Sequence, residues 1–207
     1  MRQHLGWVAG TAAAVLVAAG AITYAVAGDG GSSTTPGADS ADAGFARDMA
    51  VHHQQAVEMS YVVRDRTDDE EVRRLAYDIA QTQANQRGML LGWLDLWALP
   101  KVSSDAPMTW MGMGDMPSAG DGSLMPGMAT DAEMKKLAGL DGRKAEVFFL
   151  QLMTDHHKGG IHMAEGCVDK CAVGVEKRLA QDMVNGQRSE IELMKDMLAE
   201  RGAKPRP

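Results

Sequence analysis

Apolar residues recur along most of this chain at steps of three and four, the spacing that lines one face of an α-helix. Four long segments share the pattern: 41–66, 70–99, 143–168 and 173–202. Pro100 ends the second segment and Gly202 ends the fourth, and residues 131–138 form a shorter stretch of the same kind. No segment alternates with the period of two that marks a β-strand. The pattern therefore predicts an all-α fold with four long helices.

The first and third segments repeat one arrangement of apolar and polar positions. Its members recur without a gap: Phe45, Met49, His52, His53 and Met59, then Phe149, Met153, His156, His157 and Met163. The same offset aligns the second segment with the fourth, as in Gln83 and Gln187. Because one offset spans both helices of each half, the repeated unit is a helical hairpin.

We therefore expect a four-helix bundle over residues 41–202. Its tandem hairpins cover 41–99 and 142–202, and a Met-rich loop joins them at 100–141.

Residues 1–27 have the pattern of a secretory signal peptide. Arg2 precedes an uncharged apolar run, and Ala25-Val26-Ala27 offers small residues to a signal peptidase. The alternative is an uncleaved membrane anchor over residues 5–27, because the run is nearly long enough to span a bilayer. In both cases the rest of the chain is exported, to the cell envelope or the extracellular space. Residues 28–40 are a flexible linker by composition.

The net charge of the chain and the motifs it lacks argue against several classes of function. The chain has a formal net charge of −7 and no basic cluster, which argues against nucleic acid as a partner. It has no Gly-x-Ser-x-Gly motif and no phosphate-binding glycine loop. The sequence leaves open whether copies form a homo-oligomer, and it gives the membrane no role beyond the N-terminal segment.

The inward stripe of each long helix is apolar at its ends and polar at its middle. The middle positions are His52, His53, Gln83 and Gln86 in the first hairpin, and His156, His157, Gln187 and Glu190 in the second. Counted from turns predicted near Thr67 and Cys171, these residues lie at one height within each hairpin. A buried polar group without a partner costs about 1–3 kcal/mol. The side chains therefore either hydrogen-bond one another or hold a ligand.

Imidazole together with thioether suits copper, and thioether favours the cuprous ion. The candidate ligands are Met49, His52, His53, Met59, Met153, His156, His157, Met163 and His162. The polar residues of the second and fourth helices, with Asp48 and Asp155, are candidates to orient them. The alternative, a hydrogen-bonded layer that holds no metal and only fixes helix register, stays open.

The loop carries a second group of candidates for a soft metal. These are Met108, Met111, Met113, Met116, Met125 and Met128, set among Gly, Pro and Asp. Such a segment has no helical stripe to bury, so it favours a loose site for cuprous or silver ions. The alternative is a flexible linker whose methionines cover an apolar surface.

Cys167 and Cys171 lie at the predicted end of the third long helix. A disulfide is favoured in an exported protein, while metal ligation and free thiols are the alternatives. A di-iron oxidase is disfavoured, because that chemistry needs Glu-x-x-His from two helices. Here Glu58 is followed by Tyr61 and Glu190 by Leu193 at that spacing.

The paired histidines resemble the bacterial family known as domain of unknown function 305. The matching motifs are Asp48-Met49-x-x-His52-His53-x-x-Ala56-x-x-Met59 and Met153-x-x-His156-His157-x-Gly159-Gly160-Ile161-x-Met163-Ala164. The resemblance covers about residues 45–201. It implies a ferritin-like, duplicated bundle that is commonly exported, with copper handled by His and Met in some members.

These observations predict an extracytoplasmic protein that chelates or carries copper or silver, without an organic cofactor and without catalysis. The alternatives are a structural or interaction bundle that holds no metal and, less favoured, a metal-dependent redox enzyme.

Overall fold

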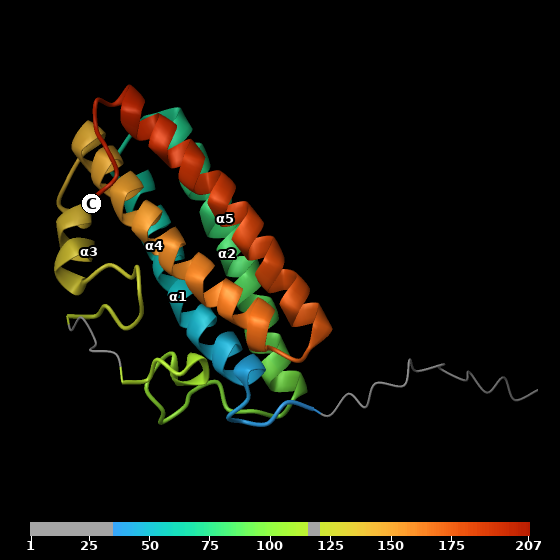
Figure 1. Ribbon diagram of the computed structural model, residues 1–207. Helices are drawn as coiled ribbons and strands as arrows, with labels where there is room; N and C mark the ends of the chain where they lie inside the picture. Colours follow the sequence, from blue (N-terminus) through green and yellow to red (C-terminus); the bar gives the residue numbers. More distant parts are fainter. Residues whose placement is uncertain (1–34, 116–120) are drawn as a thin grey trace, which may run out of the picture. The chain divides into compact units, whose positions relative to one another are not determined.

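The computed structural model describes residues 35–115 and 121–207 (Figure 1). The predicted signal peptide or anchor, and all of the predicted linker before residue 35, lie outside the described residues. None of the described helices combines the length and apolar character needed to cross a membrane.

Over the described residues the chain is helical, without strands, which confirms the all-α prediction. The elements are α1 (Ala41–Arg64), α2 (Glu70–Leu96), η1 (Thr109–Met111), α3 (Asp131–Ala138), α4 (Gly142–Lys170) and α5 (Gly174–Glu200). The long helices end within three residues of their predicted bounds, and α3 has the predicted bounds. The short 3₁₀ helix η1 was not predicted. The likeness to ferritin stays a prediction.

Side chains that accept hydrogen bonds from free backbone N–H groups fix where the helices begin. Ser40 caps α1 by accepting from Ala43 N, and Asp69 caps α2 by accepting from Val72 N. Thr130 and Glu133 form a capping box on α3. The start of α5 has no such cap of its own.

The cap of α5 comes from the other hairpin. Asp42, in the first turn of α1, accepts hydrogen bonds from Ala172 N and Val173 N at 2.9 and 2.7 Å. Its carboxylate is buried, 2 % exposed. One acidic residue therefore ties the beginning of α1 to the beginning of α5.

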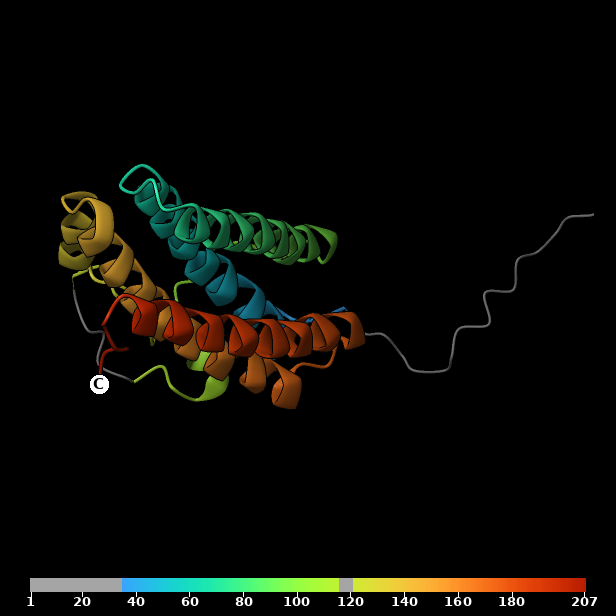
Figure 2. The same cartoon turned by 90° about the horizontal axis from the view of Figure 1, so that it is seen from above.

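The two hairpins, α1–α2 and α4–α5, join through their first helices. α1 packs against α4, and each of them packs against the second helix of its own hairpin. Seen from above, α2 and α5 lie on separate flanks (Figure 2). The helices with the paired histidines are thus central, which places the pairs in the interior.

Two apolar clusters fill the core, one on each side of the histidines. Met59 of α1 and Met153 of α4 share the first cluster, while Met49 and Met163 share the second. In the first cluster Met59, which follows the histidines of α1, lies with Met153, which precedes the histidines of α4. In the second cluster the order is reversed, because Met49 precedes its histidines and Met163 follows them. α1 and α4 therefore run antiparallel, and the repeats are related by an approximate two-fold axis near the histidines.

Part of the loop lies directly on α4. A Cβ atom built at Gly159 would stand 1.9 Å from Pro126 O, so only glycine lets the loop backbone pass there. The loop also buries Leu137 of α3 in the first cluster. The loop thus packs on the bundle in places, through Met108, Met125 and Leu137, whereas residues 100–107 are exposed.

Candidate metal centre

The two histidine pairs are buried where α1 and α4 cross. All four side chains are at most 1 % exposed. The rings of His52 and His156, which are equivalent in the repeat, stack with centroids 3.7 Å apart and planes at 33°. The second histidine of each pair turns toward its own hairpin, as expected for neighbours about 100° apart on a helix. We call these four residues, with Gln83, Gln86, Gln187 and Glu190, the histidine layer.

Each imidazole presents its Nε2 atom to an oxygen. His53 Nε2 lies 2.9 Å from Gln86 Oε1, and His157 Nε2 lies 2.6 Å from Glu190 Oε2. His156 Nε2 lies 3.0 Å from His52 O, and His52 Nε2 lies 3.4 Å from Pro126 O. The carbonyl and carboxylate acceptors place the ring proton of His52, His156 and His157 on Nε2, and with Gln86 oriented as here the same holds for His53. The lone pair is then on Nδ1.

The Nδ1 atoms of all four imidazoles are buried and have no hydrogen-bond partner. Both amide atoms of Gln83 and Oε1 of Gln187 are in the same condition. A nitrogen lone pair whose opposite N–H is held by an oxygen is the usual arrangement of a metal-binding histidine. The layer therefore has the donor chemistry that a soft or borderline metal requires.

Burial lowers the pKa of three of the imidazoles, those of His52, His53 and His156. Loss of hydration lowers the pKa of His52 and of His53 to about 3, helped by repulsion from neighbouring histidines. The same causes lower the pKa of His156 well below its ordinary value. Since the neutral ring is the form that binds metal, these three histidines do not have to lose a proton at neutral pH.

The donors do not converge as they stand. Among the described residues, one group of three His, Cys, Asp or Glu side chains brings its ligand atoms within 4.8 Å of one another, and that group contains no histidine. An ion held by three imidazoles therefore requires rings of the layer to rotate. The unpartnered amides of Gln83 and Gln187 are polar groups available to a rearranged layer.

The four predicted core methionines flank the layer. Met49, Met59, Met153 and Met163 are fully buried, two in each apolar cluster. A thioether from each repeat is thus available on both sides of the histidines. These residues also fill the core, so their burial alone does not distinguish a ligand from packing.

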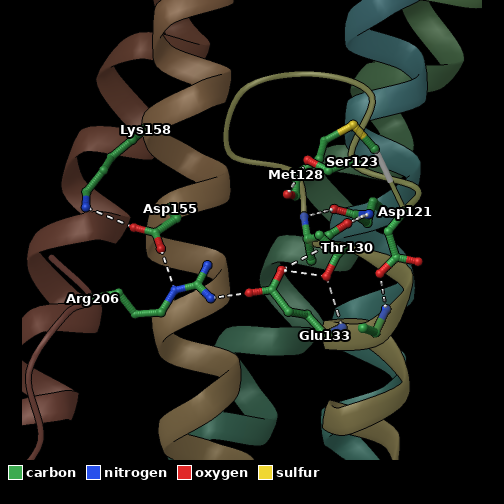
Figure 3. Close-up of polar contacts among 11 residues, drawn as sticks. Asp121, Ser123, Met128, Thr130, Glu133, Asp155, Lys158 and Arg206 are labelled. Carbon is green, nitrogen blue, oxygen red and sulfur yellow. Dashed lines mark hydrogen bonds and ion pairs between the residues drawn. The ribbon is translucent and has the colours of Figure 1, made fainter. Parts of the chain in front are cut away.

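Asp48 and Asp155 do not orient the histidines. Asp48 accepts from Met108 N and Trp110 Nε1 instead. Asp155 pairs with Lys158 and Arg206, and Arg206 also pairs with Glu133 of α3 (Figure 3). Both carboxylates face outward from the core, where they fasten the loop and the C-terminal tail to the bundle.

The loop methionines differ in burial. Met108 and Met125 are 2 % and 4 % exposed and belong to the second apolar cluster, so the expectation that the loop has nothing to bury is wrong for them. Met111, Met113 and Met128 are half-buried. Met116 lies outside the described residues. His162 is exposed on α4, with its Nε2 3.4 Å from Met113 Sδ.

Cys167 and Cys171 are joined by a disulfide at the end of α4. Beside it lies Glu176, whose side chain is fully buried and has no hydrogen-bond partner for either oxygen. Burial, and repulsion from Asp42, raise the pKa of Glu176 to about 9. Sequence reasoning missed Glu176 and Asp42, because acidic residues in the first turn of a helix are ordinarily solvated.

Fold and layer together define an all-α protein of two duplicated hairpins with a buried layer of paired histidines. The chain belongs to the family described as domain of unknown function, DUF305, whose model matches residues 42–198. No curated protein matches the chain at a significant level.

Solved structures agree with this fold. A DUF305 protein from Streptomyces coelicolor, described as a candidate secreted protein, is 77% identical, with a TM-score of 0.77 over 83% of this chain and 99% of that one. A DUF305 fragment from Deinococcus radiodurans is 30% identical, with a TM-score of 0.64 over 77% of this chain and 96% of the fragment. CopM in its Cu(I)-bound form is 22% identical, with a TM-score of 0.59 over 77% of this chain and 96% of CopM. CopM is also known with Cu(II) and with Ag bound.

Proposed function

We propose that this protein binds copper or silver ions outside the cytoplasm and holds them in the histidine layer. The observation that carries the proposal is the set of four buried Nδ1 atoms without partners, each on a ring whose Nε2 faces an oxygen. Leaving such atoms unpaired costs stability. A bound ion would satisfy them and offset that cost.

The surroundings of the layer favour a soft ion. Neutral nitrogen donors and nearby thioethers match the preferences of the cuprous ion, whereas Mg²⁺ and Ca²⁺ prefer oxygen. The described residues near the layer offer one carboxylate, Glu190, in hydrogen-bond contact with a histidine. Burial between two apolar clusters would also shield a bound ion from water.

The relatives support the same reading. CopM shares the fold and has been solved with copper and silver bound, and the Streptomyces protein is described as a candidate secreted protein. Binding without turnover accounts for a fully buried site better than catalysis does, because a catalytic metal keeps a coordination position open to substrate. The proposed role is to chelate or carry the metal after export.

A specific observation favours the competing role of a structural bundle. The histidines already donate to oxygens and do not bring three donors together. In that case the layer would only set the register of α1 against α4.

Titration with Cu(I) against a competing chelator separates the two roles. We expect tight binding by the wild type, and its loss when His52, His53, His156 and His157 are changed to Ala while helicity persists. Gln181→Ala, at an exposed position of α5 outside all the candidate ligands, is the control for a polar side chain removed elsewhere. If the fourfold variant fails to fold, the pair His52→Asn and His156→Asn tests the same site with smaller packing loss. A wild type that binds no Cu(I), or a folded variant that binds it equally, would reject the histidine layer as the site.

A further inference from the structure

The segment Met108–Met113 is fastened across α1 by one carboxylate and one glycine. Asp48 accepts from Met108 N at 2.7 Å and from Trp110 Nε1 at 2.9 Å. The indole of Trp110 lies over Gly44, where a Cβ atom would be 2.5 Å from the ring. The position of η1 is therefore fixed against the bundle.

A second glycine seats the same segment on α4. A Cβ atom at Gly166 would be 2.5 Å from Met111 Cε and 2.9 Å from Met111 Sδ, so the thioether occupies the space that the missing side chain leaves. One turn earlier on α4, His162 Nε2 lies 3.4 Å from Met113 Sδ. Residues 162 and 166 are on one face of the helix. Two thioethers and one imidazole thus gather on a single stretch of surface.

We propose that His162, Met113 and Met111 form a separate surface site for a soft monovalent ion, Cu(I) or Ag(I). The site shares its class of ion with the histidine layer but contains none of its residues, so either proposal can fail alone. Its donor set, one imidazole and two thioethers, is typical of soft-metal binding.

The spacing of the donors suits a shared ion. Bonds of about 2.0 Å to nitrogen and about 2.3 Å to sulfur, as found at zinc, leave the two donors about 3.5 Å apart when they meet at a tetrahedral angle. The observed approach of 3.4 Å is close to that separation. His162 is exposed, so its ring can move the proton from Nε2 to Nδ1 with water as the partner. Met113 and Met111 are half-buried against the second apolar cluster, so an ion would approach them from the side of the exposed imidazole.

Accessibility gives this site a role that the buried layer cannot have. An ion in the layer is enclosed by apolar clusters, whereas an ion at His162 is in contact with solvent. The surface site would therefore capture ions first, at lower affinity and with faster exchange.

Oxidation of methionine by dilute peroxide, read out residue by residue by peptide mass spectrometry, tests the site on the purified protein. With free Ag(I) at ten times the dissociation constant, the fraction of protein whose surface site holds no ion falls to roughly a tenth. Oxidation of Met113 and Met111 should slow by about the same factor. Met89, which is 40% exposed on α2, is the internal control and should be unaffected.

Two variants decide the assignment. His162→Ala should abolish the protection of Met113 while leaving Cu(I) binding by the histidine layer intact. The fourfold histidine variant of the layer should keep that protection. Equal oxidation of Met113 with and without Ag(I) would overturn the proposal, as would protection that survives in His162→Ala.

Discussion

The two hairpins have the same backbone plan and the same paired histidines, but they treat the second histidine differently. In the first hairpin His53 faces the neutral amide of Gln86, and in the second His157 faces the carboxylate of Glu190. A carboxylate behind an imidazole makes the ring a better electron donor toward a metal. In the proposed metal site the two hairpins would therefore contribute half-sites of unequal strength. We expect the second half-site to dominate metal affinity.

A second difference lies one turn away. Ala56 of α1 corresponds to Gly160 of α4, and both are buried. A Cβ atom at Gly160 would stand 2.5 Å from Gln187 Oε1, so the glycine makes room for that amide. The second hairpin therefore differs from the first both in charge and in shape around its histidines.

The largest expected effect is loss of stability in acid. The folded-state pKa of His52 and of His53 is about 3, below the unfolded value of 6.5, so the folded state binds fewer protons. Their contribution is fully present above pH 6.5 and is lost as the pH falls from 6.5 toward 3. At pH 5 the loss is about 2 kcal/mol for each imidazole. Urea unfolding at a series of pH values measures it, and His53→Asn should flatten the profile. Glu176, whose pKa is raised to about 9, slopes the profile in the opposite direction, so the two proteins are compared. Equal slopes below pH 6.5 in the wild type and in His53→Asn would contradict the neutral first pair.

Next in size is the effect of the acceptors on metal affinity. Glu190→Ala should weaken Cu(I) binding by roughly 10–100-fold, because orienting groups typically contribute that much. Gln86→Ala should weaken it less, since a neutral amide supports the ring less strongly. Chelator competition measures both. Equal losses would show that the half-sites do not differ.

The space that Gly160 leaves for the Gln187 amide should have a smaller effect on stability and on Cu(I) affinity. Gly160→Ala displaces Gln187 and is expected to cost about 1–2 kcal/mol of unfolding free energy. The reverse change at the equivalent position, Ala56→Gly, should cost about 1–2 kcal/mol through helix propensity and the loss of one buried methyl group. Thermal unfolding measures the stability of the two variants, and a parallel titration measures their affinity for Cu(I). Only Gly160→Ala should alter that affinity, and a change in both variants would count against the asymmetry in shape.

The smallest expected effect is that of Gln86→Glu. It gives the first hairpin the carboxylate of the second and should raise Cu(I) affinity by about threefold to tenfold, at the lower end of what orienting groups contribute. The matched control is Gln54→Glu, on the exposed face of α1. Lower affinity in Gln86→Glu than in the control would mean that the added carboxylate does not support His53.

Periodicity and repetition were enough to predict most of the fold. The stripes through His52 and His156 indicate which face of each helix is buried, and the shared offset indicates which helices pair. The stacking of His52 on His156 was not predictable, because it depends on how α1 crosses α4. The loop path over Gly159 was equally hidden, since it rests on one backbone contact between distant segments.

Within the candidate sites, the type of a residue and its helix face predicted its contacts better than its closeness to the histidines in the sequence did. His53 and His157 face the helix positions predicted for them, whereas Asp48 and Asp155, adjacent to the motifs, hydrogen-bond elsewhere. Asp155 directly precedes His156 and therefore points in a different direction from it. Asp48 lies four residues before His52, on the same face of α1, and accepts from the loop instead. Glu176 gave no sequence signal, because its burial is imposed by α1 and the disulfide.

The cap that Asp42 places on α5 has a kinetic consequence. The N–H groups of Ala172 and Val173 gain their partner from a residue about 130 positions earlier in the chain. The start of α5 thus lacks this partner until the first hairpin is docked, and the docking must close a long loop. Contacts of such sequence separation slow folding relative to local helix formation. We therefore expect the hairpins to appear early, and their union at Asp42 to set the pace at which the chain reaches its native state.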